Sequence, residues 1–82
     1  MDTNTALPVT RKYQLHPGMP GERLILLRGR FGLSMEDLAK LANVSIHTVR
    51  RVEHGELVHE RSLMALAHAL GVPLSYLYKP ID

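Results

Sequence analysis

Two segments with helical periodicity are separated by only three residues, Asn43-Val44-Ser45. Helices joined by so short a link must cross at a steep angle, and their backbones therefore approach each other closely. The crossing needs a small side chain, which Ala39 supplies. The link itself needs a residue that tolerates a positive φ, and asparagine is the best choice after glycine. The pattern predicts two short helices packed at an angle around a tight turn, with Val44 and Val49 closing the small core between them.

The helix after the link has both a start signal and a stop signal. Ser45 can accept a hydrogen bond from a backbone N–H of the first turn, and Gly55 can adopt the left-handed conformation that ends many helices. Val49 and Val52 mark the inward face by their spacing. Together with the tight link, these features define a helix-turn-helix. Glu53 lies four residues after Val49 and shares the inward face, where a carboxylate needs a cation beside it.

The rest of the sequence predicts an all-α fold of five short helices, with no confident strand. Gly32 should end the first helix, and the sequence Ser34-Met35-Glu36-Asp37 resembles a capping box that begins the second. A loop at residues 56–60 precedes the fourth helix, and Pro73 suits the start of a short fifth helix. The inward positions that the spacing predicts are Leu24, Leu27, Arg28 and Phe31 in the first helix, Leu38, Leu41 and Ala42 in the second, Leu63, Leu66, Ala67 and Leu70 in the fourth, and Leu74 and Leu77 in the fifth.

Helical periodicity begins at Glu22, and the last predicted helix ends a few residues before the C-terminus, so we divide the chain into three parts. We interpret residues 1–20 as an N-terminal arm, residues 21–78 as one domain and residues 79–82 as a C-terminal tail. The arm has three possible roles: an unstructured tail, a contact with the minor groove of DNA through Arg11-Lys12, or a strand that pairs across a dimer. The strand alternative rests on a weak alternation of apolar residues at Leu7, Val9, Tyr13 and Leu15.

Composition excludes several classes of protein. The 82 residues suffice for one small domain, and the absence of cysteine excludes disulfides and thiolate chemistry. The longest aliphatic run, residues 24–27, is far too short to cross a membrane, and the N-terminus lacks the features of a signal peptide, so we expect a cytoplasmic protein. The sequence shows no Ser/His/Asp grouping near a plausible pocket, so we expect neither enzymatic activity nor a cofactor. We also expect no metal site, because the i, i+4 spacing of helical metal ligands is missing among His47, His54, His59 and His68.

The stretches LRGRFGLSMEDLAKLANVSIHTVRRVEHGE and SLMALAHALGVPLSYL resemble the Cro/lambda-repressor-like (XRE-like) DNA-binding family. The resemblance covers about residues 21–78, with two departures: Met35 stands where the family usually has glutamine, and Asn43 replaces its turn glycine. In the family, an arginine of the first helix commonly pairs with the glutamate that matches Glu53. The corresponding residue here is Arg28, which also lies on the apolar face of its own helix. We therefore expect a buried ion pair, because pairing offsets most of the cost of burying each charge.

The resemblance implies that the outward face of the third helix enters the major groove of DNA. Arginine suits bidentate donation to guanine, histidine can donate to a purine N7, and isoleucine can cover a thymine methyl. Base contacts are therefore expected at Ile46, His47, Arg50 and Arg51. Phosphate contacts are expected at the start of the second helix, along the third helix and just after the loop, at Met35, Ser45, Thr48, His54 and Arg61.

The function predicted from these features is sequence-specific binding of double-stranded DNA by a transcriptional regulator. A homodimer on a palindromic operator is favoured, because one helix reads too few base pairs for useful specificity. Repression is favoured over activation, because 82 residues leave little spare surface for effectors. The alternative is a protein-interaction module, such as an antitoxin, that binds a partner protein through the arm or the C-terminal end. Tyr76 and Tyr78 near that end either finish the core or form a dimer patch.

Overall fold

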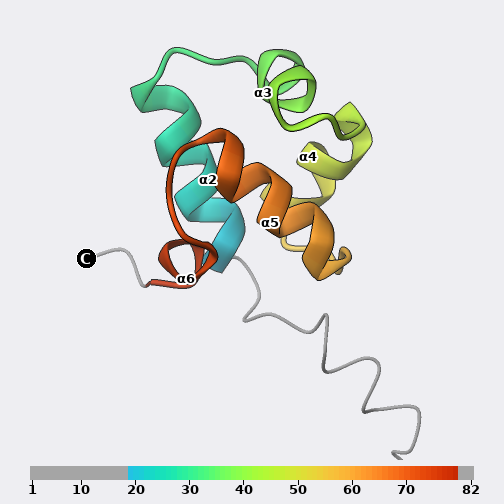
Figure 1. The fold of residues 1–82 in the computed structure, drawn as a ribbon. Coiled ribbons are helices and arrows are strands. Elements are labelled where there is room, and N and C mark those ends of the chain that lie inside the picture. Colours follow the sequence, from blue (N-terminus) through green and yellow to red (C-terminus); the bar gives the residue numbers. More distant parts are fainter. Residues whose placement is uncertain (1–18, 80–82) are drawn as a thin grey trace, which may run out of the picture.

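Five helices follow one another in residues 19–79, the part of the chain that the computed structural model describes (Figure 1). They are α2 (Met19–Arg30), α3 (Met35–Ala42), α4 (Ile46–Glu53), α5 (Glu60–Ala69) and α6 (Leu74–Leu77). This stretch contains no strand, so the predicted all-α fold is confirmed. The weak strand pattern in the N-terminal arm lies outside the described residues. None of the helices in residues 19–79 has the length and hydrophobicity that crossing a membrane requires.

The ends of α3 and α4 follow the predicted capping chemistry. Ser34 Oγ accepts from the Asp37 N–H at 3.0 Å while the Asp37 carboxylate accepts from the Ser34 N–H at 3.1 Å, which completes the capping box. The hydrogen bond from the Ser34 backbone N–H is the main reason that the pKa of Asp37 lies below its usual value. Ser45 caps α4 by accepting from the Thr48 N–H at 3.1 Å. In the turn between the two helices, Asn43 takes the predicted left-handed conformation with φ 58°.

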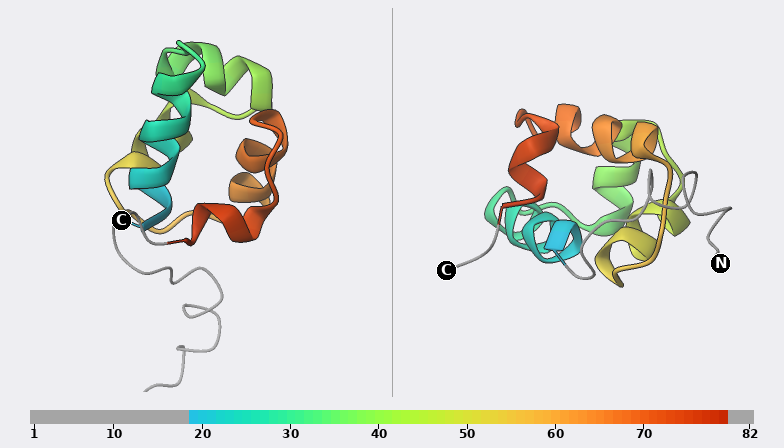
Figure 2. Two further views of the ribbon diagram at one scale, coloured as in Figure 1. Left: turned by 90° about the vertical axis from the view of Figure 1, so that its left-hand side faces the viewer. Right: turned by 90° about the horizontal axis from the view of Figure 1, so that it is seen from below.

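All five helices contribute to one apolar core. Helix α2 packs against α4 and α6, while α3 packs against α4 and α5, and α6 also contacts α5. The views from the side and from below show α2 and α5 on opposite sides of the domain, with α3 and α6 at its two ends (Figure 2). The buried apolar residues are Leu24 and Leu27 of α2, Leu38 and Ala39 of α3, Val49 and Val52 of α4, Leu63, Leu66 and Ala67 of α5, Leu70 after α5, and Leu77 of α6.

Two side chains predicted to face inward are exposed instead. Phe31 directly follows the last residue of α2, and its side chain is 55% exposed although its backbone N–H still bonds to the Leu27 carbonyl oxygen. Leu41 is 60% exposed. The residues of α3 that pack on the core are centred roughly 110° around the helix from position 41, at 100° per residue. Phe31 and Leu41 line a shallow apolar hollow of about 380 Å³ together with residues at the end of α5.

Helix α2 begins three residues earlier than the predicted start at Glu22. Pro20 lies in the first turn, where its missing N–H would have no partner within the helix in any case. Gly21 is buried at the point where α2 crosses the last turn of α4. A Cβ atom at this position would clash with the carbonyl oxygen of Val52 and lie 3.0 Å from the Cα of Glu53. The absence of a side chain therefore sets how closely α2 approaches the end of α4.

We predict opposite effects of alanine at the two glycines inside α2. Gly21→Ala should lower the free energy of unfolding by about 1–3 kcal/mol, because the backbone of α4 must move to admit the methyl group. Gly29→Ala should raise it by about 0.5–1 kcal/mol, because alanine favours the helix. A Cβ atom at position 29 would meet nothing within 4 Å. Urea denaturation followed by circular dichroism measures both changes, and equal shifts in the same direction would contradict the close approach at Gly21.

Candidate nucleic-acid interface

Helix α4 divides its eight residues between the core and the solvent. Val49 and Val52 are fully or almost fully buried, and the Glu53 side chain is 7% exposed. His47 and Arg51 are exposed on the other side of the helix, and Arg50 is half-buried. This is the division that the valine spacing predicted. The outward side of α4 therefore carries long side chains that can donate hydrogen bonds, while its inward side fixes the helix on the domain.

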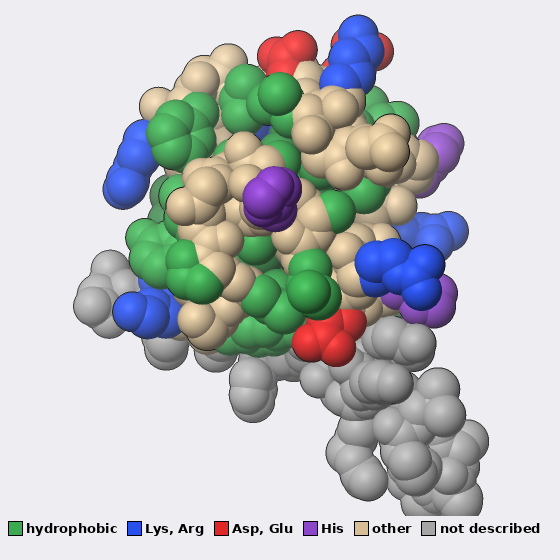
Figure 3. All heavy atoms as spheres, viewed as in Figure 1, with side chains coloured by type: hydrophobic (Ala, Val, Ile, Leu, Met, Phe, Trp, Pro, Cys, Tyr) green, Lys and Arg blue, Asp and Glu red, His purple; other side chains and the backbone are tan. Residues whose placement is uncertain are grey.

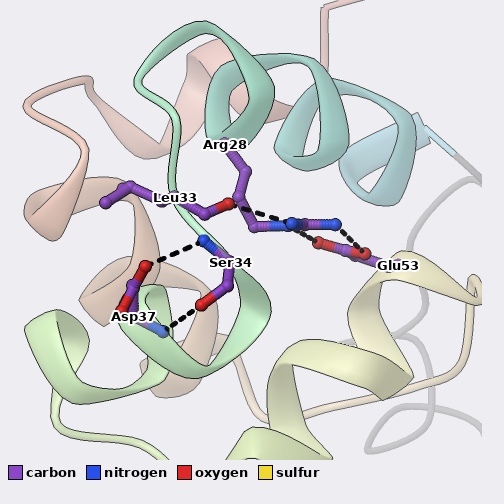
Figure 4. Close-up of polar contacts among 5 residues, drawn as sticks. All are labelled: Arg28, Leu33, Ser34, Asp37 and Glu53. Atoms are coloured by element: carbon purple, nitrogen blue, oxygen red, sulfur yellow. Dashed lines mark hydrogen bonds and ion pairs between the residues drawn. The ribbon is translucent and has the colours of Figure 1, made fainter.

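The predicted ion pair between Arg28 and Glu53 is present and joins α2 to the end of α4 (Figure 4). Arg28 Nε donates to Glu53 Oε2 at 2.6 Å, and Nη2 donates to Oε1 at 3.1 Å, so the pair is bidentate. The remaining terminal nitrogen, Nη1, donates to the carbonyl oxygen of Leu33 at 3.0 Å. Since Leu33 directly precedes the Ser34 cap of α3, one guanidinium connects three successive helices.

The pair is less deeply buried than predicted, because the Arg28 side chain is 21% exposed. Its guanidinium is therefore still partly in contact with water, whereas the carboxylate of Glu53 is almost fully shielded. The carboxylate depends on the arginine more than the arginine depends on the carboxylate.

Two of the predicted base-contact residues touch each other. Arg50 Nη1 lies 3.3 Å from His47 Nδ1, one helical turn away along α4. Both side chains lie on the outward side of the helix. Arg51 projects on the same side and is more exposed than Arg50.

A hollow of about 270 Å³ separates the outward side of α4 from the start of α5. Thr48 and Arg51 line it from α4, and Leu57, Val58, His59 and Ser62 line it from the loop and from α5. Basic and histidine side chains gather over this side of the molecule, at the right edge of Figure 3, where Figure 1 places α4 and the first turn of α5. Exposed Glu56 and Glu60 lie in the loop and at the first position of α5, so negative charge also accompanies these cationic side chains. Residues of the predicted site from α4 and from the start of α5 therefore lie on one surface, on either side of this hollow.

The other residues predicted to contact DNA differ in how far they are exposed and in what they contact. Met35 and Ile46 are only partly exposed and pack against the core, which leaves part of each side chain for a ligand. Ser45 and Thr48 bond each other through their hydroxyl groups at 3.1 Å. His54 is exposed at the far end of α4, where its backbone N–H closes the last turn. Arg61 is exposed in the first turn of α5 and lines a second small hollow with His59 and Ser62.

Sequence reasoning missed His59 and Ser62, which the structure places beside Arg51 and Arg61. Histidine is not among the residues favoured at the start of a helix, so no clear signal in the sequence marks the beginning of α5 after His59. Tyr76, which was expected either to finish the core or to form a dimer patch, packs against the core and lies under the guanidinium of Arg23 at 4.7 Å from the ring centre. Within residues 19–79, no group of three potential metal ligands comes together.

Residues 24–77 match the sequence model of the helix-turn-helix family. The match runs from α2 to α6 and covers well over half of the chain, so the chain belongs to this family. A relative from Acanthamoeba polyphaga mimivirus, named as an uncharacterized HTH-type transcriptional regulator, is 36% identical over 56 residues. The matched part is 63% of this chain and 25% of the relative, so the chain spans about a quarter of that relative's length.

We predict that Glu53→Ala destabilises the domain strongly. Removal of one partner leaves the other charge unpaired, which typically costs about 3–5 kcal/mol for a buried pair. Because Arg28 keeps some contact with water, we expect the free energy of unfolding to fall by about 3 kcal/mol. Glu56→Ala is the matched control, since Glu56 is exposed in the loop and its loss should change the free energy of unfolding by less than about 0.5 kcal/mol. Similar urea midpoints for the two variants would show that the ion pair does not hold α4.

Proposed function

We propose that this protein is a transcriptional repressor that binds a palindromic DNA operator as a homodimer, with α4 in the major groove. The observation that carries the proposal is the division of α4. Val52 and Glu53 fix the helix on the domain, and His47, Arg50 and Arg51 project from the opposite side. An α-helix held in this way fits the major groove, where the edges of the bases carry distinct patterns of donors and acceptors.

Arg51 is the residue that we expect to contact a guanine. It is exposed, and it lies one turn beyond His47, so the two side chains can reach neighbouring base pairs along the groove. A guanidinium can donate two hydrogen bonds at once to guanine O6 and N7, which no other base offers as a pair of acceptors. The half-exposed Ile46 at the first position of α4 is suited to an apolar contact with a thymine methyl.

The start of α5 is suited to the phosphate backbone. The backbone N–H groups of a first helical turn, together with the helix dipole, favour an anion at that end. Exposed Arg61 adds a full positive charge there, and Ser62 adds a hydroxyl beside it. Because the hollow with Arg51 adjoins this turn, a DNA strand that passes α4 would also meet the start of α5.

Two copies of the domain are needed to read a useful length of DNA. One helix contacts only a few base pairs, whereas two helices related by a two-fold axis read two half-sites one helical turn apart. Repression requires nothing beyond occupancy, because a protein dimer on its operator keeps other proteins from the same DNA. Binding of a protein partner through the arm or the C-terminal end, the alternative drawn from the sequence, stays a prediction.

Selection of binding sites from random duplexes tests this function. The enriched sequences should contain two inverted half-sites whose centres are about 10 base pairs apart. Sedimentation should find two protein chains for each duplex, and the selected operator placed over a promoter should reduce transcription when the protein is present. One protein on an asymmetric site would contradict the dimer, increased transcription would contradict repression, and no enriched sequence would contradict specific binding altogether.

We predict that Arg51→Ala and Arg61→Ala have different effects on DNA binding. Loss of the Arg51 base contact should remove about 1–3 kcal/mol of discrimination at one base position and leave most non-specific binding intact. Loss of Arg61 should weaken binding to every sequence alike and reduce the salt dependence by about one phosphate contact.

Titration of operator and scrambled duplexes at several salt concentrations measures both effects. If Arg51→Ala weakens the two duplexes by the same factor, Arg51 is a backbone contact, and the recognition surface is rotated around α4 from the one proposed.

A further inference from the structure

The contact between His47 and Arg50 has a defined chemical direction. Nη1 of Arg50 lies 3.3 Å from Nδ1 of His47. A guanidinium carries only donors, so the ring nitrogen must be the acceptor and cannot carry a proton in this arrangement. The imidazole is then neutral, with its proton on Nε2. The arginine thereby selects one tautomer of the histidine.

The same contact restricts the arginine. Arg50 is half-buried and has rotatable bonds along its whole side chain, and fixing such a chain carries an entropy cost on binding. A hydrogen bond from the guanidinium to His47 holds its end near the outward side of α4 before any DNA is bound. Since positions 47 and 50 are one turn apart, the bond requires no distortion of the helix.

We propose that His47 is a positioning residue for Arg50 and that the two side chains read DNA as one unit; this inference rests on the proposed function. His47 Nδ1 orients the guanidinium of Arg50, and the tautomer that this bond selects leaves the Nε2–H of His47 as a donor toward a neighbouring base. The unit presents donors only. It therefore selects guanine at the Arg50 position, through O6 and N7, and a base with an acceptor, such as a purine N7 or thymine O4, at the His47 position.

Two conservative variants of His47 separate the two roles. Asparagine places its side-chain oxygen near the position of Nδ1 and has no group at the position of Nε2. Glutamine reaches the position of Nε2 with an amide N–H and has no group at the position of Nδ1. His47→Asn therefore keeps the partner of Arg50 and loses the donor to the base, whereas His47→Gln does the reverse. Arg50→Ala identifies the base position that Arg50 reads.

The experiment measures the affinity of the full chain and its variants for the selected operator and for duplexes that each carry one changed base pair, at one salt concentration. His47→Gln should reduce discrimination at the Arg50 position by about 2- to 12-fold, the contribution of one hydrogen bond of this kind. His47→Asn should keep discrimination there and lose it at an adjacent base pair. The double variant His47→Gln/Arg50→Ala should show no further loss at the Arg50 position beyond that of Arg50→Ala.

Unchanged discrimination at the Arg50 position in His47→Gln, or an equal loss in His47→Asn, would overturn the inference while leaving the proposed function intact. A wild-type protein that prefers no duplex would overturn both. Nitrogen NMR of the histidine rings gives a test without DNA. The free protein should show His47 with its proton on Nε2, and Arg50→Ala should reduce that preference, whereas a proton on Nδ1 in the wild-type protein would overturn the inference. Thermal unfolding of each variant checks that the substitutions at His47 and Arg50, neither of which lies in the core, leave the fold unchanged.

Discussion

The arrangement of this domain depends on the hydrogen bonds that the guanidinium of Arg28 makes. This guanidinium lies on α2, makes a bidentate pair with Glu53 at the end of α4, and donates to the backbone at Leu33 immediately before α3. Hydrophobic contacts bring these helices together and restrict their crossing angles only within a broad range, because the hydrophobic driving force itself has no direction. Hydrogen bonds to a planar group do have one. The ion pair therefore contributes orientation of α4 more than it contributes net stability, since both partners lose hydration when they meet.

A second constraint acts on the same end of α4 from the backbone side. Gly21 lets α2 approach Val52 and Glu53 more closely than any residue with a side chain would allow. This close approach brings α2 alongside the turn of α4 that carries Glu53, and Arg28 meets the carboxylate two turns further along α2. The backbone contact at Gly21 and the ion pair of Arg28 with Glu53 therefore both hold the last turn of α4. The opposite side of α4 takes no part in either contact, and its side chains stay available for a ligand.

Features set by neighbours in sequence could be predicted, and features set by distant segments could not. The capping box at Ser34 and the left-handed Asn43 depend on residues within one helical turn, so the local sequence determines them. Leu41 was predicted to be buried because its spacing from Leu38 fits a helix, but the extent of an inward face depends on how many helices cover it. The close approach at Gly21 was not predicted, since nothing nearby in sequence shows that α4 passes against it.

The candidate site shows the same limit. Val49, Val52 and Glu53 define the outward side by elimination, which is why the exposed positions of α4 could be predicted. The ion pair of Glu53 with Arg28 required the resemblance to a family together with the apolar face of the first helix. The approach of His59 and Ser62 to Arg51 depends on the path of the loop between α4 and α5, for which the sequence carries no periodic signal.

The separation of the two sides of α4 has a consequence for how such a protein can diverge. Apart from Ile46, which packs against the core and is also partly exposed, the residues that hold the helix and those that face outward occupy different positions within the eight residues of α4. Substitutions at 47, 50 and 51 can therefore accumulate without weakening the core. Position 28 needs arginine, because its three planar nitrogens bond both carboxylate oxygens of Glu53 and the Leu33 carbonyl, a geometry that the compact ammonium of lysine cannot reproduce. Under the proposed function, the DNA sequence that is recognised can drift during evolution while the fold stays constant.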